Sequence, residues 1–157
     1  MVPVDLNVSI AEDPSQVYEG VRVSRMSMRI TRSRVIDPRY SLDEVVALIG
    51  EFFDEFPTDV SLVEQSARWV HFFAGFHFFQ DANHRTGMNT LEVAMLKSGL
   101  ENTSPVIDGR EYEEETKVAR EKSKRVRDVR EMSSSRIFEN DRLYYVWYDY
   151  FDDVLSP

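Results

Sequence analysis

The segment SLVEQSARWVHFFAGFHFF, residues 61–79, constrains the fold more than any other part of the chain. Ser61 and Glu64 have the spacing of a capping box, which predicts the start of a helix. The apolar residues that follow nearly encircle the helix axis, a pattern typical of a helix covered on all sides. A helix of this kind needs other elements around it. We therefore predict a mainly α-helical domain with this helix at its centre.

Further helices are predicted before and after this segment. Residues 41–56, SLDEVVALIGEFFDEF, repeat the capping-box spacing and end before a proline. Helicity resumes after QDAN, from about Asn83. Residues 108–130 carry charges at helical spacing and few apolar side chains, which predicts a largely exposed helix. Residues 136–155 are aromatic enough to pack on the core, as a helix or alternatively as a strand.

The N-terminal part of the chain has weaker signals. Residues 1–14 lack a sustained period and are expected to form a loosely held lead-in. Residues 21–35 alternate with a change of phase, which fits a strand with a bulge or a hairpin. Six arginines and one aspartate give residues 21–40 a net charge of +5. This segment is either a solvated strand face or a docking surface for an acidic partner. We expect a lead-in over 1–20 and one domain over 21–157.

Composition limits the classes of function. A net charge of −9 argues against general affinity for nucleic acid, because phosphate binding depends mostly on lysine and arginine. The absence of cysteine excludes disulfides and thiolate metal sites. The N-terminus does not resemble a secretion signal, and no run of about 18 apolar residues occurs. We therefore expect a cytoplasmic protein without a nucleic-acid or membrane partner.

The polar cluster HFFQDANHR, residues 77–85, follows the central helix directly. The helix predicted from Asn83 would present unpaired backbone N–H groups at its start, and these form an anion site. Asn83 can brace the turn through side-chain to backbone bonds, while the small Ala82 lets a ligand approach the main chain. Arg85 can add a planar set of donors for phosphate oxygens. The spacing therefore predicts a phosphate-binding turn.

Two more residues of this cluster suit chemistry on a phosphate ligand. Asp81 offers the oxygen ligands that Mg²⁺ prefers when it is bound to phosphates. His77, at the end of the buried helix, can act as a general base near neutral pH. The alternative is ordinary packing and turn chemistry, with a buried imidazole and an aspartate that caps a helix. A zinc site from His71, His77 and His84 is less favoured, because their spacing matches no metal-ligand pattern.

The same segment resembles the signature of the Fic/Doc family, which can be written HxFx(D/E)(G/A)N(G/K)R. The matching residues are His77, Phe79, Asp81, Ala82, Asn83 and Arg85. The alanine in DAN, and Met88 where many Fic proteins have a second arginine, are nearer the Doc, or death-on-curing, branch. The resemblance implies the Fido fold, a helical bundle with a short β-hairpin flap. Residues 21–36 are the candidate for that flap.

The resemblance also implies a role for each matching residue. His77 would accept the proton of a target protein hydroxyl, Phe79 would anchor the loop in the core, and Asp81 would hold Mg²⁺. The remaining residues would bind the phosphates of ATP: Ala82, Asn83 and His84 as the anion-binding turn, and Arg85 through its guanidinium.

The type of transfer depends on the position of His84. Fic proteins usually transfer AMP to a protein Ser, Thr or Tyr and generally have glycine there. Doc proteins are toxins that transfer phosphate to a translation factor, are silenced by a partner antitoxin, and have lysine there. Because histidine is bulky like lysine, phosphate transfer is slightly preferred, with adenylyl transfer (AMPylation) as the alternative. The alternative from another class is a catalytically silent Fido domain that binds a protein partner.

A second motif precedes the arginine-rich segment. SQVYEG, residues 15–20, matches the pattern (S/T)xxxE(G/N) with which many Fic proteins block their own ATP site. In that role Glu19 would compete with phosphate for Arg85. The usual partner of such a glutamate is the second arginine, which Met88 replaces. The alternative is a helical turn that ends at Gly20.

Overall fold

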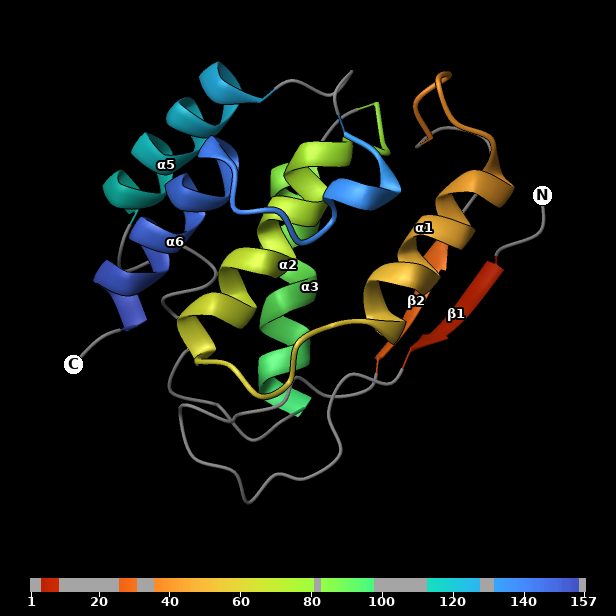
Figure 1. Ribbon diagram of the computed structural model, residues 1–157, viewed down its shortest axis with the longest axis horizontal. Helices are drawn as coiled ribbons and strands as arrows, with labels where there is room; N and C mark the ends of the chain where they lie inside the picture. The colour runs from red at the N-terminus through yellow and green to blue at the C-terminus, as the bar shows by residue number, and fades with distance from the viewer. Residues whose placement is uncertain are drawn as a thin grey trace.

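The computed structural model describes residues 4–8, 26–30, 36–80, 83–97, 113–127 and 132–155. Its helices surround a central one, so the predicted mainly helical class is confirmed (Figure 1). The elements, in chain order, are β1 Val4–Val8, β2 Met26–Ile30, α1 Leu42–Asp54, α2 Leu62–Phe76, α3 Asn83–Lys97, α5 Glu113–Val126, the 3₁₀ turn η2 Ser134–Arg136, and α6 Arg142–Leu155.

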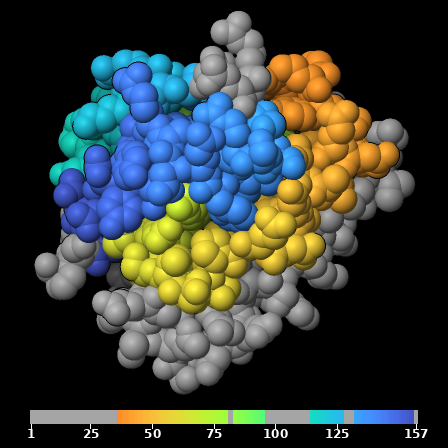
Figure 2. Space-filling view, in the orientation of Figure 1, coloured from red at the N-terminus to blue at the C-terminus, as the bar shows by residue number. Residues whose placement is uncertain are grey.

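Helix α2 is the buried centre that its sequence predicts. It packs between α3 and α6, and α1 contributes aromatic side chains to the same core (Figure 1). Phe72 of α2 stacks on Phe52 of α1 with ring centroids 4.1 Å apart, and both rings are fully buried. The segment from residue 132 to 140 lies across α2, where the Arg68 guanidinium donates to the Phe138 carbonyl at 2.8 Å (Figure 2). Neighbours therefore cover α2 on several sides, as a helix with encircling apolar residues requires.

The capping residues act as the sequence predicts. The Ser41 hydroxyl accepts from the Glu44 backbone N–H, and the Ser61 hydroxyl accepts from the Glu64 backbone N–H, each at 3.1 Å. These bonds satisfy donors that a helix start would otherwise leave unpaired. The starts of α1 and α2 are thus set by local chemistry.

Helix α3 lies close against α2. A side chain at Gly87 would come within 3.3 Å of the Phe73 Cβ, so the absence of a side chain allows this approach. One turn further, the fully buried Trp69 indole N–H donates to the Thr90 hydroxyl at 2.9 Å. The two contacts fix how α3 starts and runs relative to the end of α2.

Helices α5 and α6 form an antiparallel pair on the other side of α2 (Figure 1). Thr116, early in α5, bonds Tyr150, late in α6, with 2.7 Å between their hydroxyl oxygens. Trp147 and Phe151 of α6 are fully buried. The last element is therefore a helix that packs on the core, and the alternative of a strand is wrong. The described part of the expected exposed helix, α5, has most of its side chains in solvent.

One expectation for the N-terminal part is corrected, and another is not confirmed. Residues 4–8, expected in a loosely held lead-in, form β1, which pairs antiparallel with β2 and lies beside α1 (Figure 1). Val4 is opposite Ile30 and Val8 is opposite Met26. The strand expected within 21–35 is present as β2, but its described partner comes from residues 4–8 instead of a hairpin inside 21–36. The expected hairpin flap is therefore not confirmed. Within the described ranges, no helix is long and apolar enough to cross a membrane.

Candidate functional site

His77 caps the end of helix α2 and has an unusual backbone conformation. Its φ of 55° and ψ of 54° are left-handed, and among the described residues His77 is the only one other than glycine with positive φ. The sequence predicts helix as far as Phe79, but this conformation ends it at Phe76. A non-glycine residue in this region costs roughly 1–3 kcal/mol, and such residues are common at functional sites. The turn directs the half-buried His77 out of the core.

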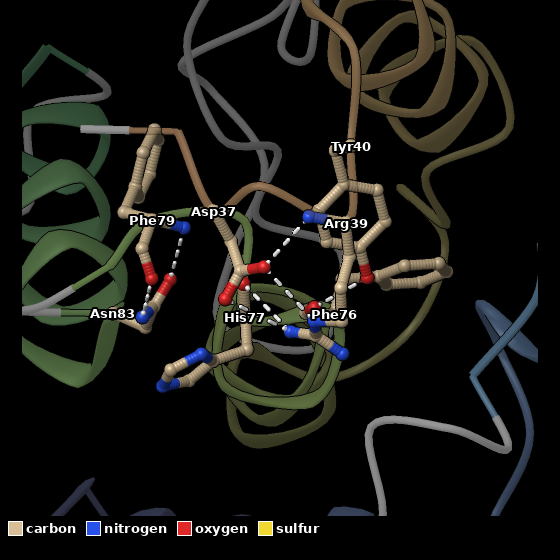
Figure 3. A network of polar contacts seen from close by, with 7 residues as sticks. All are labelled: Asp37, Arg39, Tyr40, Phe76, His77, Phe79 and Asn83. Atoms are coloured by element: carbon tan, nitrogen blue, oxygen red, sulfur yellow. Dashed lines mark hydrogen bonds and ion pairs between the residues drawn. The ribbon is translucent and has the colours of Figure 1, made fainter. Parts of the chain in front are cut away.

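Residues 36–40 hold the turn from the opposite side (Figure 3). Ile36 forms an antiparallel bridge with Phe79, and the Asp37 backbone N–H donates to the Phe78 carbonyl at 2.6 Å. The Tyr40 hydroxyl donates to the Phe76 carbonyl at 2.6 Å. A strand-like clamp therefore satisfies backbone groups of the chain leaving α2.

An ion pair belongs to the same clamp. The Arg39 Nε donates to the Asp37 carboxylate at 3.0 Å, and the Arg39 Nη2 donates to the His77 carbonyl at 3.4 Å. The hydrogen bond from Arg39 lowers the pKa of the Asp37 carboxyl, and the nearby His77 contributes to the same direction. Figure 3 shows the His77 imidazole extending away from these contacts. The backbone of His77 is thus held while its ring reaches the outer side of the turn.

Asn83 closes the turn at the start of α3. Its side-chain oxygen accepts from the Phe79 backbone N–H at 3.0 Å, and its side-chain N–H donates to the Phe79 carbonyl at 2.8 Å (Figure 3). Asn83 is 3% exposed and Phe79 is 8% exposed, so both bonds are shielded from water. The bracing that the sequence predicts for Asn83 is present. The ring of Phe79 is part of the core, in agreement with an anchor for the loop.

His84 turns away from the loop toward α5 and α6. Its Nε2 lies 2.7 Å from the Ser123 hydroxyl oxygen, and its ring packs against Trp147 with centroids 5.8 Å apart. Burial, as the largest cause, together with the positive charges of Arg127, Lys124, His77 and Arg120 lowers the pKa of His84 to about 4. The imidazole is therefore neutral at pH 7. Any contact of His84 with an anion in the turn would come from its backbone N–H.

A row of cations on α5 faces the same region. Arg120 and Lys124 of α5, and Arg127 directly after its end, have the spacing of one helix face, and all three influence the pKa of His84. They lie around Ser123, whose carbonyl accepts from the Arg127 backbone N–H at 3.0 Å. Burial lowers the pKa of Arg127, and the positive charge of Arg39 contributes to the same direction. Cationic side chains from two distant segments thus lie beside the turn, and of these Lys124 is paired with Glu121 and Arg39 with Asp37.

Arg85 and Met88 have opposite environments on α3. Arg85 is exposed, and in the part of the chain that the structure describes its guanidinium forms no ion pair. Met88 is 6% exposed and belongs to the core. A second arginine would therefore be poorly accommodated at position 88, where a buried charge would lack a partner. The first turn of α3 contains no acidic residue, so no carboxylate within that turn offsets the positive end of the helix.

Three of the predicted site residues lie outside the described residues: the metal candidate Asp81, Ala82 and the inhibitory candidate Glu19. The side chains of the arginine-rich segment before Arg39 lie outside them as well. Within the described ranges, no group of three or more His, Asp or Glu residues is arranged to hold a metal ion. His71 is instead fully buried and bonds the partly exposed Asp141 at 3.0 Å.

Sequence reasoning missed two parts of this site. The clamp formed by Asp37, Arg39 and Tyr40 meets the turn through a contact between segments about 40 residues apart, for which the sequence carries no signal. The cations of α5 were visible as a charged helix, yet nothing local indicated which face would approach His84. The DPRY stretch before α1 did signal a turn, because aspartate and proline favour one.

Comparison of the chain with protein-family models, with curated proteins and with solved structures finds no match. The resemblance to the Fic/Doc signature therefore stands on the motif residues themselves. The geometry around the turn is the basis for the function proposed below.

Proposed function

We propose that the protein is a Mg²⁺- and ATP-dependent transferase that modifies a Ser, Thr or Tyr hydroxyl of a protein. The observation that carries the proposal is the turn between α2 and α3, where His77 lies beside a helix N-terminus that Asn83 holds in place. A base next to an anion-binding helix end suits the transfer of a phosphorus group to a hydroxyl. The Fic/Doc-like motif is the second support.

The positive charges around the turn support phosphate binding. Arg85 is exposed in the first turn of α3, where its guanidinium can donate to phosphate oxygens. Arg127 directly follows α5 and influences the pKa of His84, so it can supply a cation from another segment where Met88 replaces the second arginine of many Fic proteins. Several cations fit a polyphosphate better than a single phosphate group. A nucleoside triphosphate is therefore the proposed donor.

The proposed reaction moves one proton and one phosphorus group. The target hydroxyl oxygen forms a bond to phosphorus, the bond from phosphorus to the leaving phosphate oxygen breaks, and the proton passes to an imidazole nitrogen of His77. ATP with Mg²⁺ supplies the transferred group and part of the charge neutralisation. Asp81 would hold the metal, since one carboxylate together with phosphate oxygens is a common protein contribution to a Mg²⁺ site. The helix N-terminus and Arg85 would stabilise the charge on the phosphates.

The orientation of His84 bears on which group is transferred. The slight preference for phosphate transfer rests on a bulky side chain at this position. The ring, however, is committed to Ser123 and Trp147 and does not extend into the turn. This observation supports adenylyl transfer as the second candidate function. With the ring turned away, position 84 leaves room for phosphates, as glycine does in Fic proteins.

Labelled ATP tests the proposal and separates the two transfers. The protein is incubated with Mg²⁺ and a lysate, using ATP labelled either at the α or at the γ phosphate. Label from the α position on a protein indicates adenylyl transfer, and label from the γ position indicates phosphate transfer. His77→Ala should abolish either signal. Circular dichroism of this variant, with His71→Gln at a buried histidine away from the turn for comparison, tests for general loss of structure. If neither label reaches a protein, the silent binding module replaces the enzyme.

A further inference from the structure

Helices α5 and α6 enclose a groove on the outer side of their pair. Its volume is about 770 Å³. The side chains along it repeat at helical spacing on both helices, with Val118, Lys122 and Arg125 from α5 and Arg142, Val146 and Asp149 from α6. Val118 is 51% exposed and the neighbouring Tyr145 is 49% exposed, which are large values for apolar side chains on a folded surface. The groove therefore has an apolar floor that is open to solvent.

The charges of the groove are segregated along its length. Because the helices are antiparallel, the start of α5 and the end of α6 share one end of the groove. Glu114, Glu115, Asp149 and Asp153 lie at that end. The other end carries Lys122, Arg125 and Arg142. Within the described residues, none of these seven side chains takes part in an ion pair. The groove thus has an acidic end and a basic end, and the charges at both ends lack ion-pair partners among the described residues.

Helix stability does not explain this arrangement on α6. Cations are favourable near the C-terminus of a helix and anions near its N-terminus. Arg142 stands at the first residue of α6 and Asp153 in its last turn, the reverse of the favourable order. Each end of the groove also gathers like charges from two helices, which repel one another. A partner with the opposite charge order would remove both costs.

The groove is separate from the candidate site. Each of the groove positions 118, 122 and 125 lies two residues before one of the positions 120, 124 and 127. Two residues correspond to a rotation of about 200° around a helix. The cations that influence His84 therefore lie on the face of α5 opposite the groove. Occupation of the groove does not require the turn at His77 to be catalytic.

We propose that the groove binds an amphipathic α-helix of a partner protein, with acidic residues in its first turn and basic residues in its last. This charge order stabilises the partner helix itself and places its acidic start at Arg125 and Arg142. The helix would run antiparallel to α5, with an apolar stripe on Val118 and Val146. About three turns, or 11 to 12 residues, span the distance from Glu114 to Arg125 at 1.5 Å per residue.

Two peptides of equal composition provide the test. Each is fluorescein-labelled, about 14 residues long and carries leucine at positions i, i+4 and i+7. One has glutamates first and lysines last, and its isomer has lysines first and glutamates last. Fluorescence anisotropy with the full chain, at about 50 mM salt, should show the first peptide binding at least about tenfold more tightly than its isomer.

Variants of the groove provide the controls. Val118→Asp should weaken binding of the first peptide at least about tenfold, because it places a charge in the apolar floor. Val93→Asp, at another exposed helical valine 42% in solvent, should leave binding unchanged. The double variant Arg125→Glu/Asp149→Lys should narrow or reverse the discrimination between the isomers, an effect that loss of structure does not produce.

Three results would overturn the proposal. The first is equal affinity of the parent protein for the two isomers, and the second is unchanged binding by Val118→Asp. The third comes from sedimentation velocity of the parent protein without peptide. If the chain dimerises, and Val118→Asp but not Val93→Asp restores the monomer, the groove is covered by a second copy of the chain and not by a partner helix.

Discussion

Replacing Asn83 with alanine removes two buried hydrogen bonds from the turn between α2 and α3. The Phe79 backbone N–H and carbonyl both lose their side-chain partner, and Asn83 is only 3% exposed. The Ile36 bridge does not replace these bonds, because its described hydrogen bond goes to the Phe78 carbonyl. A buried backbone group without a partner costs about 1–3 kcal/mol, so two such groups cost about 2–6 kcal/mol.

Urea denaturation and thermal denaturation, each followed by circular dichroism, measure this loss of unfolding free energy. A loss of about 3 kcal/mol lowers the Tm by roughly 6–12 °C for a domain of this size. Asn89→Ala is the matched control, since Asn89 lies on the same helix with its side chain exposed. It reports the gain in helix propensity from asparagine to alanine without loss of a buried bond. Equal stability of the two variants would refute the view that Asn83 holds the turn.

Two further predictions concern the helices around the turn. Because His84 has a pKa of about 4 in the folded protein and about 6.5 when unfolded, the unfolded chain binds more protons between these values, and stability falls as pH is lowered through this window. The parent protein should lose more unfolding free energy between pH 7 and pH 5 than His84→Gln does, by about 2 kcal/mol. An equal loss in the two proteins would contradict a neutral, buried imidazole at position 84. Thr90→Val should cost about 1–3 kcal/mol, because the fully buried Trp69 indole N–H loses its acceptor. Thr86→Val, on the same helix, should cost less in the same denaturation assay, and an equal cost would argue against the Trp69 bond.

The helices were predictable because their signals are local. The capping serines at 41 and 61 start α1 and α2, and periodic apolar residues identify the faces that pack. The end of α2 was placed too late, because Phe78 and Phe79 continue the aromatic run while the backbone has already turned at His77. Both rings are buried although their residues lie in a loop. An apolar pattern that indicates burial therefore could not distinguish loop from helix here.

The remaining features depend on contacts between distant segments. Strand β1, VDLNV, alternates apolar and polar residues over only five positions, and its partner β2 lies about 20 residues later in the chain. His84 was read as part of the phosphate site, but the approach of Ser123 turns its ring toward α5. The clamp at Asp37 and Arg39 likewise forms only when the chain returns to the end of α2. Local spacing therefore predicted the motif on its helix ends, while tertiary packing decided what surrounds it.

Binding of Mg²⁺ and ATP, measured by isothermal titration calorimetry, tests the central claim that the turn between α2 and α3 is a phosphate site. The parent protein should bind ATP more tightly than AMP, because several cations surround the turn. Arg85→Ala and Arg127→Ala should each weaken ATP binding about tenfold, the effect of losing one charge-assisted hydrogen bond. Arg142→Ala, at an exposed arginine of the groove, should bind ATP like the parent. Equal binding of ATP by the parent and by Arg85→Ala would contradict the account.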